Sequence, residues 1–430
     1  MRANASVVSD LVPEVRSASR PDVVTGEQRQ RSISRRRWWR APGRVWVRRV
    51  HLWATLSLGL LLLIVTTSGA ALVLRPEFDR LLHQSLYTSS PGAATVSLEA
   101  AIQTVHQAYP ESPILFVTPP EQGDRYIVAV DEPYRFVFVD PVTGTLAGDF
   151  DAETGVLGFL TRLHTAFFAD EILLPNVGWP LSQVILGTSA IVLLLMVITG
   201  AVLWWPGVRR FLVNGFGVRF GRNSYTTNHD LHKVVGVVAL IPLLLWALTA
   251  ANFEFYDQVH ALFYALTPGE APPEMAEVVS NPDSGAGITA DTARQIALAA
   301  VPGARFSSLV PPADESGYYD VWLARGLDPY EYGEFPGESL VQVDRYSGAI
   351  LQQVYVNYDN AASEGYEMWS YPIHTGILAP WPVRLVWIVF GLTPLGLAVT
   401  GVAMWWFKRR ARSRAGQRRM AESPMLAPAD

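Results

Sequence analysis

The chain has 430 residues, of which 50% are hydrophobic and only 17% are charged, and it contains no cysteine. Because a globular protein usually carries about 25% charged residues, this composition argues against an ordinary soluble enzyme and a disordered protein. The net charge of −5 provides no overall positive field, so we expect no nucleic-acid partner. The lack of cysteine excludes disulfides, cysteine-ligated zinc, iron–sulfur clusters and covalently attached c-type haem.

Four apolar stretches are long enough to cross a lipid bilayer, which requires roughly 20 residues as a helix. They contain LWATLSLGLLLLIVTTSGAALVL, LSQVILGTSAIVLLLMVITGAVLWW, VVGVVALIPLLLWALTAANF and VRLVWIVFGLTPLGLAVTGVAMWWF. We therefore predict membrane-spanning helices at 45–75, 181–206, 231–253 and 383–407.

Charged residues are distributed unevenly between the segments that flank these spans. Arginine is concentrated in 1–44, in the loop 207–230 and in the tail 408–430, whereas 76–180 and 254–382 are rich in Asp and Glu. Since basic flanks stay in the cytoplasm, we expect a multi-pass protein of the cytoplasmic (inner) membrane, with both termini inside and both long segments outside. The first 44 residues are expected to be mostly disordered. The first span begins too late for a cleavable signal peptide, so it should remain as an anchor.

The two halves of the chain resemble each other. HTAFF, which begins at 164, is followed by ITGAVLWW, and HTGIL, which begins at 374, is followed by VTGVAMWW. FVFVDPVTGTL at 136–146 likewise matches LVQVDRYSGAIL at 340–351, and each predicts a strand, a turn and a strand. Amphipathic helices with a Ser or Thr N-cap are predicted before them, at 97–109 and 289–301.

The expected fold is an α-helical membrane protein with four transmembrane helices in two parallel repeats. The two long segments are expected to form two extracytoplasmic α+β domains, one for each half. Since both halves cross the membrane in the same order, the axis that relates them should run along the membrane normal.

The ordered set of these motifs resembles the PepSY-associated transmembrane family over roughly residues 45–410. The motifs are RRVHLWATLSLG at the first span, NHDLHKVVG at the third, the two His-Thr entries, the Thr-Gly endings and the Val-Asp-x-x-Thr/Ser-Gly hairpins. The resemblance implies PepSY-like outer domains. Some members of the family are inner-membrane ferric-siderophore reductases with two b-type haems, and others have no assigned chemistry. On this resemblance we expect two haem b groups and favour an iron chelate as the substrate, which the family name alone does not fix.

Four histidines occupy matching positions at the ends of the spans. His51 and His232 lie at the cytoplasmic edges of the first and third spans, and His164 and His374 precede the second and fourth. Ionisable residues at such depth are candidates for function, and imidazoles from facing helices can hold a cofactor in a bundle. We predict that each of the two pairs binds one haem iron, a ligation that suits electron transfer because no coordination position stays open. The alternative is that each histidine is a boundary residue whose polar edge meets water.

Three further histidines leave alternatives open. His229 lies one helical turn before His232 and could replace it as a ligand. His83 and His260 match each other, but they lie beyond the outer ends of the first and third spans, where a structural role is the simpler interpretation.

Cations near the histidine pairs are candidate partners for the anionic haem propionates. Arg48 and Arg49 adjoin His51, although they also serve as ordinary positive-inside signals. Arg162 and Arg384 lie near the outer pair, on a side that is otherwise acidic. Glycines in the spans would suit either a flat macrocycle or close helix packing.

Other catalytic signatures are missing from the sequence, including a phosphate-binding loop, a dinucleotide fingerprint, His-Glu-x-x-His and Gly-x-Ser-x-Gly. We predict a di-haem electron carrier that takes electrons from a cytoplasmic protein or the quinone pool and acts as a ferric siderophore reductase. One alternative is a cofactor-free membrane protein whose outer modules bind a protein or peptide. Another is a permease component for iron chelates, which four mostly apolar spans make less favourable.

Overall fold

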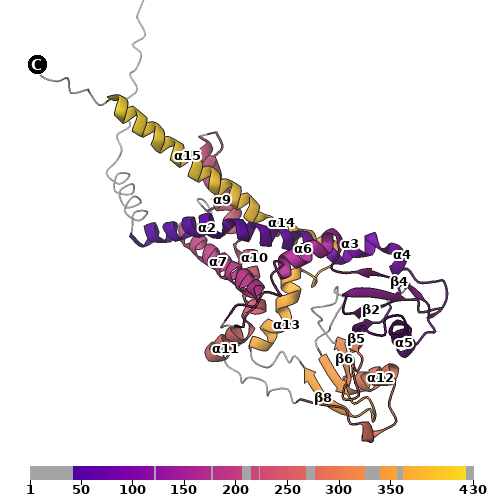
Figure 1. The fold of residues 1–430 in the computed structure, drawn as a ribbon. Helices are drawn as coiled ribbons and strands as arrows, with labels where there is room; N and C mark the ends of the chain where they lie inside the picture. The colour runs from indigo at the N-terminus through magenta and orange to yellow at the C-terminus, as the bar shows by residue number, and fades with distance from the viewer. Residues whose placement is uncertain are drawn as a thin grey trace, which may run out of the picture.

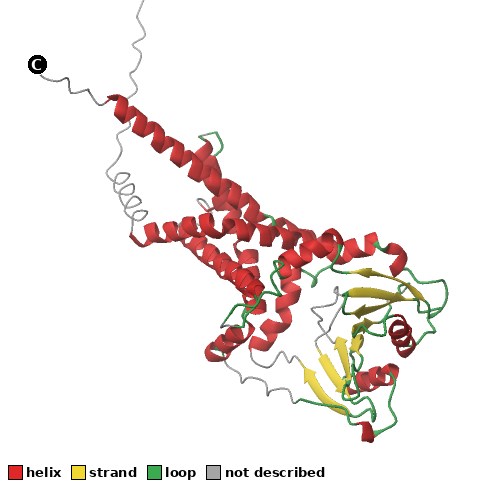
Figure 2. Ribbon diagram, viewed as in Figure 1, coloured by secondary structure: helices red, strands yellow, loops and turns green. Residues whose placement is uncertain are grey.

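A bundle of long apolar helices is joined to a separate region of strands and short helices (Figures 1 and 2). The computed structural model describes residues 42–120, 123–175, 178–205, 215–221, 223–267, 277–324, 339–355 and 362–422. The predicted disordered tail up to residue 41 and part of the predicted loop 207–230 lie outside the described residues.

Three predicted spans coincide with single stretches of helix that are long and apolar enough to cross a membrane. They are α2 (Pro42–Leu72), α7 (Leu181–Trp204) and the stretch Trp381–Gln417, which includes α14 (Trp381–Gly391) and most of α15 (Thr393–Glu422). The span predicted at 231–253 is instead two helices, α9 (Ser224–Val238) and α10 (Leu240–Glu254), bent by 57°. The chain is therefore a multi-pass membrane protein, and its described residues include three candidate spans, or four if the bent pair is one.

The bend between α9 and α10 has an identifiable cause in the sequence. Pro242 has no backbone N–H, so the carbonyl four residues earlier, at Val238, loses its helical donor. Pro394 follows the short break at Leu392 between α14 and α15 in the same way. A proline within each of these two spans could have been read from the sequence as a site of bending.

The spanning helices pack as one bundle with an apolar outer surface. Helix α7 contacts both α2 and α10, α2 also contacts α14 and α15, and α9 contacts α15. Large apolar side chains on the outside stay exposed, among them Leu60 at 72%, Ile241 at 67% and Val389 at 64%. Apolar exposure of this kind on long helices is typical of a surface that meets lipid.

Eight antiparallel strands form one continuous sheet in the order β4-β3-β2-β1-β5-β6-β7-β8. The strands are β1 (Ile114–Thr118), β2 (Tyr126–Val130), β3 (Arg135–Val139), β4 (Leu146–Asp151), β5 (Arg305–Val310), β6 (Tyr319–Ala324), β7 (Ser339–Val343) and β8 (Ile350–Tyr355). The two long segments contribute four strands each, and they meet where Val117 of β1 pairs with Leu309 of β5. The sequence predicts one α+β unit in each long segment, and the structure joins the strands of both segments in one sheet.

The two predicted amphipathic helices are present, and they cover the sheet. They are α5 (Leu98–Ala108) and α12 (Ala290–Ala300), whose apolar faces join the valines of the central strands in one core. Their N-caps are Ser97 and Thr289, whose side-chain oxygens accept hydrogen bonds from backbone N–H groups three residues later, at 3.1 and 3.2 Å. The remaining helices are α3 (Arg75–Leu82), α4 (Gln84–Tyr87), α6 (Gly155–Thr165), α11 (Tyr256–Leu266), η2 (Pro282–Ser284) and α13 (Ala362–Thr375).

The first turns of α5 and α12 cap each other. The Asp291 carboxylate accepts hydrogen bonds from the backbone N–H groups of Leu98 at 3.2 Å and Glu99 at 3.0 Å, and the Glu99 carboxylate accepts one from Ala290 at 2.8 Å. Carboxylates are stabilising at helix N-termini because those N–H groups lack helical partners. The reciprocal caps therefore fix the two sets of four strands to each other.

Replacing Asp291 with alanine should lower the free energy of unfolding of the sheet region by about 2 kcal/mol, because two helix N–H groups lose their acceptor. The measurement is the thermal unfolding midpoint of the full chain in detergent. Glu111→Ala is the matched control, since Glu111 is exposed and its loss should leave the midpoint unchanged. Equal midpoints for the Asp291 and Glu111 variants would contradict the capping role.

The aspartates of the two matching hairpins, Asp140 and Asp344, are 2% and 3% exposed. Asp140 accepts hydrogen bonds from the backbone N–H groups of Val142 at 2.9 Å and Ser90 at 2.8 Å. Asp344 accepts them from Tyr346 at 3.0 Å and from two further residues. The repeated Val-Asp-x-x-Thr/Ser-Gly pattern is therefore a turn closed by a buried carboxylate.

The charge of Asp140 makes the stability of its hairpin depend on pH. Burial alone would raise the pKa of the Asp140 carboxyl, but N–H donors from Ser90, Val142 and Thr143 outweigh burial and hold this pKa well below its ordinary value of 3.8. Ionised Asp140 therefore stabilises the fold above about pH 4, and this contribution disappears as the pH falls toward the lowered pKa.

We expect Asp140→Asn to lower the thermal unfolding midpoint of the full chain at pH 7. Between pH 5 and pH 3 the midpoint of this variant should fall less than that of the wild type. The measurement is thermal unfolding at each pH. The control is Asp170→Asn, since the Asp170 side chain is 49% exposed. If the Asp140 variant kept the steep acid dependence of the wild type, another carboxylate would be responsible.

Candidate functional site

Two histidines from different halves of the chain face each other at one end of the bundle. The ring centroids of His51 on α2 and His232 on α9 are 6.4 Å apart, with ring planes at 84°. The Nδ1 of His51 lies 2.8 Å from Thr199 Oγ1 on α7. The Nδ1 of His232 lies 3.0 Å from Thr400 Oγ1 and 3.1 Å from the Leu397 carbonyl, both on α15. Each ring is thus held by a neighbouring helix.

A second pair lies at the other end of the spans. The ring centroids of His164 on α6 and His374 on α13 are 6.1 Å apart, with ring planes at 42°. The Nδ1 of His164 lies 2.9 Å from the Val65 carbonyl and 3.4 Å from Ser68 Oγ, and the Nδ1 of His374 lies 2.8 Å from Thr249 Oγ1. The structure thus brings together the four histidines in the two pairs that the repeat suggests.

The hydrogen bonds to carbonyl groups assign the tautomer of two of these rings. A carbonyl oxygen only accepts, so the Nδ1 of His164 must donate to Val65 and the Nδ1 of His232 must donate to Leu397. A neutral imidazole with a proton on Nδ1 has an unprotonated Nε2. That nitrogen carries the lone pair with which histidine binds a metal.

The threonine partners assign the same tautomer to the other two rings. The hydroxyl groups of Thr199 and Thr249 donate to carbonyl groups four residues earlier, at 2.6 and 2.9 Å. Since each hydroxyl has one proton, it must accept from the Nδ1 of His51 or His374. All four imidazoles therefore donate through Nδ1 and keep Nε2 as an acceptor, which is how metal-binding histidines are usually oriented.

Glycines next to these hydroxyl groups adjoin the rings, and at Gly69 the absence of a side chain is required. A Cβ added at Gly69 would lie 2.5 Å from the ring of His164, whereas one added at Gly200 or Gly401 would lie 3.6 Å from the ring of the adjacent histidine, which is an ordinary contact. Near the end of each predicted span, a hydroxyl residue is followed by a small one: Ser68-Gly69, Thr199-Gly200, Thr249-Ala250 and Thr400-Gly401. The sequence shows the Thr-Gly endings but not that they hold the histidines.

Other glycines in the spans serve helix packing. A Cβ at Gly187 would lie 2.4 Å from the ring of Phe255, and one at Gly391 would lie 2.8 Å from the Cβ of Ala70. Gly396 has open space around it. Some glycines of the spans therefore adjoin histidine rings, and others adjoin side chains of neighbouring helices.

Each pair can supply two protein ligands to a metal. Among the described residues, no group of three or more His, Asp or Glu side chains is placed to hold a metal ion. Two imidazoles bound on opposite sides of one metal ion, each through a nitrogen about 2 Å from it, would have ring centroids about 6 Å apart. The spacing of both pairs matches this arrangement, and the remaining ligands would have to come from a macrocycle or small molecules.

The arginines predicted near the second pair already face carboxylates. Arg384 is 3% exposed, and its guanidinium forms an ion pair with Glu77 and donates to the Val73 carbonyl at 3.2 Å. Arg162 lies 3.7 Å from Asp170 in an exposed pair. The pairing of Glu77 with Arg384 was not predicted from the sequence, because nothing distinguishes Glu77 from the other acidic residues of the same segment.

On the first side, Arg48 and Arg49 are exposed on α2. Their exposure fits the positive-inside interpretation as well as it fits a propionate contact. The backbone of the following turn carries His51, so both arginines belong to the end of the bundle where the first pair lies.

The other candidate histidines lie elsewhere. The His229 side chain is 46% exposed and lies 3.3 Å from the buried carboxylate of Asp230, which in turn pairs with Arg219 at 2.7 Å. It is therefore His232 whose ring faces His51. His83 stacks on Phe150 with centroids 4.0 Å apart, and His260 stacks on Tyr256 with centroids 4.1 Å apart.

The amino-acid sequence matches one known family model over most of its length. Residues 48–408 match the family described as the PepSY-associated TM region. No curated protein matches the chain. The matched range includes both histidine pairs, the sheet and the apolar parts of the helices that pack in the bundle.

Proposed function

Since the chain belongs to the PepSY-associated TM family, we propose that it is a membrane electron-transfer protein that holds two haem b groups and reduces an iron chelate outside the cytoplasm. The observation that carries the proposal is the placement of the four imidazoles. They form two pairs whose spacing suits one metal ion, and the Nδ1 of each lies within hydrogen-bond distance of a neighbouring helix, so that donation through Nδ1 leaves Nε2 as the ligand atom.

The donor set fits an iron porphyrin better than a bare ion. Each pair offers two nitrogen ligands, and a porphyrin supplies four more, which fills the coordination sphere of iron. His51 and His232 would hold one haem, and His164 and His374 the other. When bound, each haem would supply an iron that gains and loses one electron.

The protein surroundings would tune that chemistry through the Nδ1 hydrogen bonds, which orient each ring and raise its basicity as a ligand. His51 and Ser68, which adjoins His164, are 17 positions apart on α2, so the two sites lie about 25 Å apart along the helix. Apolar side chains of the spans exclude water between them. The two sites would thus lie near opposite faces of the membrane.

The expected orientation gives the transfer a direction. We propose an inner-membrane protein built as two parallel repeats, with both termini in the cytoplasm and PepSY-like modules outside. Electrons would enter from a cytoplasmic protein or the quinone pool at the His51–His232 site. The substrate would be a ferric siderophore or a similar chelate, because Fe(II) binds hard oxygen ligands less tightly than Fe(III), and one electron loosens the complex.

The first experiment is an absorption spectrum of the full chain, expressed with a haem supply and purified in detergent. We expect b-type bands after dithionite reduction and two haems per chain. The reduced protein should then be reoxidised by a ferric siderophore without oxygen, and the Ga(III) complex of the same siderophore is the control, since gallium accepts no electron under these conditions. A colourless preparation would refute the proposal.

A further inference from the structure

A strongly basic surface follows the last apolar residues of α15. The segment from Lys408 to Gln417 is exposed throughout and contains no acidic residue. Its basic side chains are Lys408, Arg409, Arg410, Arg412 and Arg414. Lys408 still contacts α9, since its Nζ lies 5.1 Å from the centroid of the Tyr225 ring, and beyond it helix α15 runs on past the other helices of the bundle (Figure 1).

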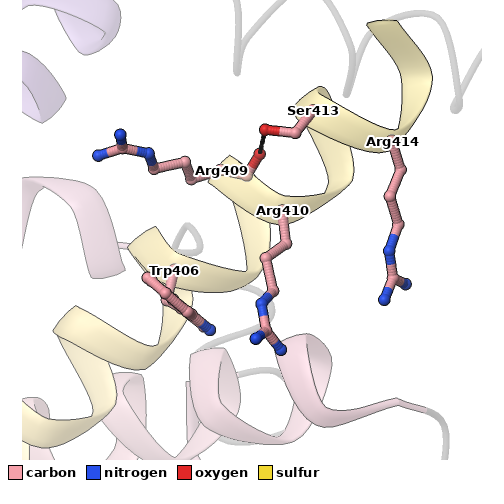
Figure 3. A pocket seen from close by; sticks show the side chains of 5 residues that line it. All are labelled: Trp406, Arg409, Arg410, Ser413 and Arg414. Carbon is pink, nitrogen blue, oxygen red and sulfur yellow. Dashed lines mark hydrogen bonds between the residues drawn. The ribbon is translucent and has the colours of Figure 1, made fainter. Parts of the chain in front are cut away.

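A shallow depression on this surface is lined by one aromatic and several polar side chains, which are Trp406, Arg409, Arg410, Ser413 and Arg414. Trp406, Arg410 and Arg414 are spaced four residues apart and therefore share a face of the helix. Figure 3 shows these three side chains extending to the same side of α15, while Arg409 extends to another. The depression thus combines an indole ring with guanidinium groups at increasing distance from the apolar span.

Stacking on an indole ring fixes the position of Arg410 and leaves its N–H groups available as hydrogen-bond donors. The Arg410 guanidinium lies over the Trp406 ring, 4.8 Å from its centroid, and Arg409 lies over Trp405 at 5.4 Å. A stacked guanidinium engages the ring through its face, and its N–H groups in the plane remain able to bind an anion in bidentate fashion. Within the described part of the chain, no carboxylate forms an ion pair with either arginine.

The position along the helix indicates what the anion is. Tryptophan at the end of a span lies at the level of the lipid headgroups. Arg410 is one turn beyond Trp406 and Arg414 is two turns beyond it, or about 6 and 12 Å along the axis. A phosphate next to Arg410 would therefore lie at headgroup depth, and its acyl chains could follow the exposed apolar face of the bundle.

We propose that Trp406, Arg410 and Arg414 form a binding site for the headgroup of an anionic phospholipid. Clusters of basic residues directly beside a membrane span attract such lipids electrostatically. Here the indole ring orients the central guanidinium, so the site should depend on specific positions rather than on total charge alone. The same helix carries Thr400, which holds His232, so the lipid would also anchor the helix that orients this ligand.

The test compares binding of phosphatidylglycerol and phosphatidylcholine to the full chain, by native mass spectrometry from neutral detergent micelles. We expect preference for phosphatidylglycerol and an apparent Kd about fivefold weaker in Arg410→Gln, since one basic group near the surface contributes about that factor. Arg410→Gln/Arg414→Gln should weaken binding about 25-fold. Excess inorganic phosphate should not displace the lipid.

Arg412→Gln is the matched control, since Arg412 lies about 200° around the helix from Arg410 and its loss removes the same charge. It should change the Kd less than twofold, and its unfolding midpoint should equal those of the other variants. Equal weakening in the Arg410 and Arg412 variants would show a diffuse charge effect and overturn the proposal. Displacement by inorganic phosphate, or equal binding of both lipids, would overturn it as well.

Discussion

Replacing His51 with alanine should remove one of two bound haems and leave the other, and the same result is expected for His232, His164 and His374 in turn. A haem held by one remaining imidazole would bind weakly or be lost, whereas the site at the other end of the bundle does not contact the substituted residue. Paired variants then identify the partners. His51→Ala/His232→Ala should keep one haem, and His51→Ala/His164→Ala should keep none, measured as haem per chain.

The control for this series is His229→Ala, which should keep both haems. His229 is adjacent to the same motif, but its side chain is half exposed and bonds to Asp230. The assigned pairs would be contradicted if His51→Ala/His164→Ala kept a full haem, or if His51→Ala/His232→Ala kept none. Loss of haem in the His229 variant alone would favour that residue as the ligand.

Replacing Arg384 with leucine should destabilise the protein by about 3 kcal/mol or more, because it leaves the carboxylate of Glu77 without its buried partner. Arg384 is 3% exposed, and one oxygen of Glu77 and the Nε of Arg384 have no hydrogen-bond partner within the described residues. The measurement is the thermal unfolding midpoint of the full chain in detergent. Arg384→Leu/Glu77→Leu should recover most of the loss, since neither charge then remains unpaired.

Arg162→Ala is the matched control, because the Arg162–Asp170 pair is exposed and spans 3.7 Å, and such a pair contributes at most about 1 kcal/mol. Haem content distinguishes the role of Arg384 in the ion pair with Glu77 from a role as partner of a haem propionate. If Arg384 held a propionate, its loss would lower haem occupancy while Glu77→Gln would not. If the double variant were as unstable as the single one, the ion pair would not be the cause of the loss.

The sequence predicted the spanning helices well, because the length of an apolar stretch is a strong local signal. The bend at Ala239 was not predicted, although Pro242 was visible, since a proline within a long apolar run does not by itself show how far the helix will turn. The sheet was anticipated only in part. Its joining strands, β1 and β5, are almost 190 residues apart in the chain, and no local pattern indicates that they pair.

The histidines could be identified from sequence because they occur at matching positions in the two halves. Their partners could not, since a threonine or serine in an apolar helix usually bonds to its own backbone. Ser68 and Thr249 carry no distinguishing pattern, and they gain a role only when α6 and α13 place histidines beside them. Glu77 was missed for a related reason, because its partner lies more than 300 residues away.

The shared sheet has a consequence for any attempt to study the halves separately. Cutting the chain between α7 and α9 would leave β1 on one fragment and β5 on the other as unprotected edges, with unpaired N–H and C=O groups. Each fragment would also lose the acceptor or donor groups that the opposite helix now provides. Expressed alone, either fragment should self-associate through that edge, whereas the two expressed together have complementary edges and should reassemble into one particle.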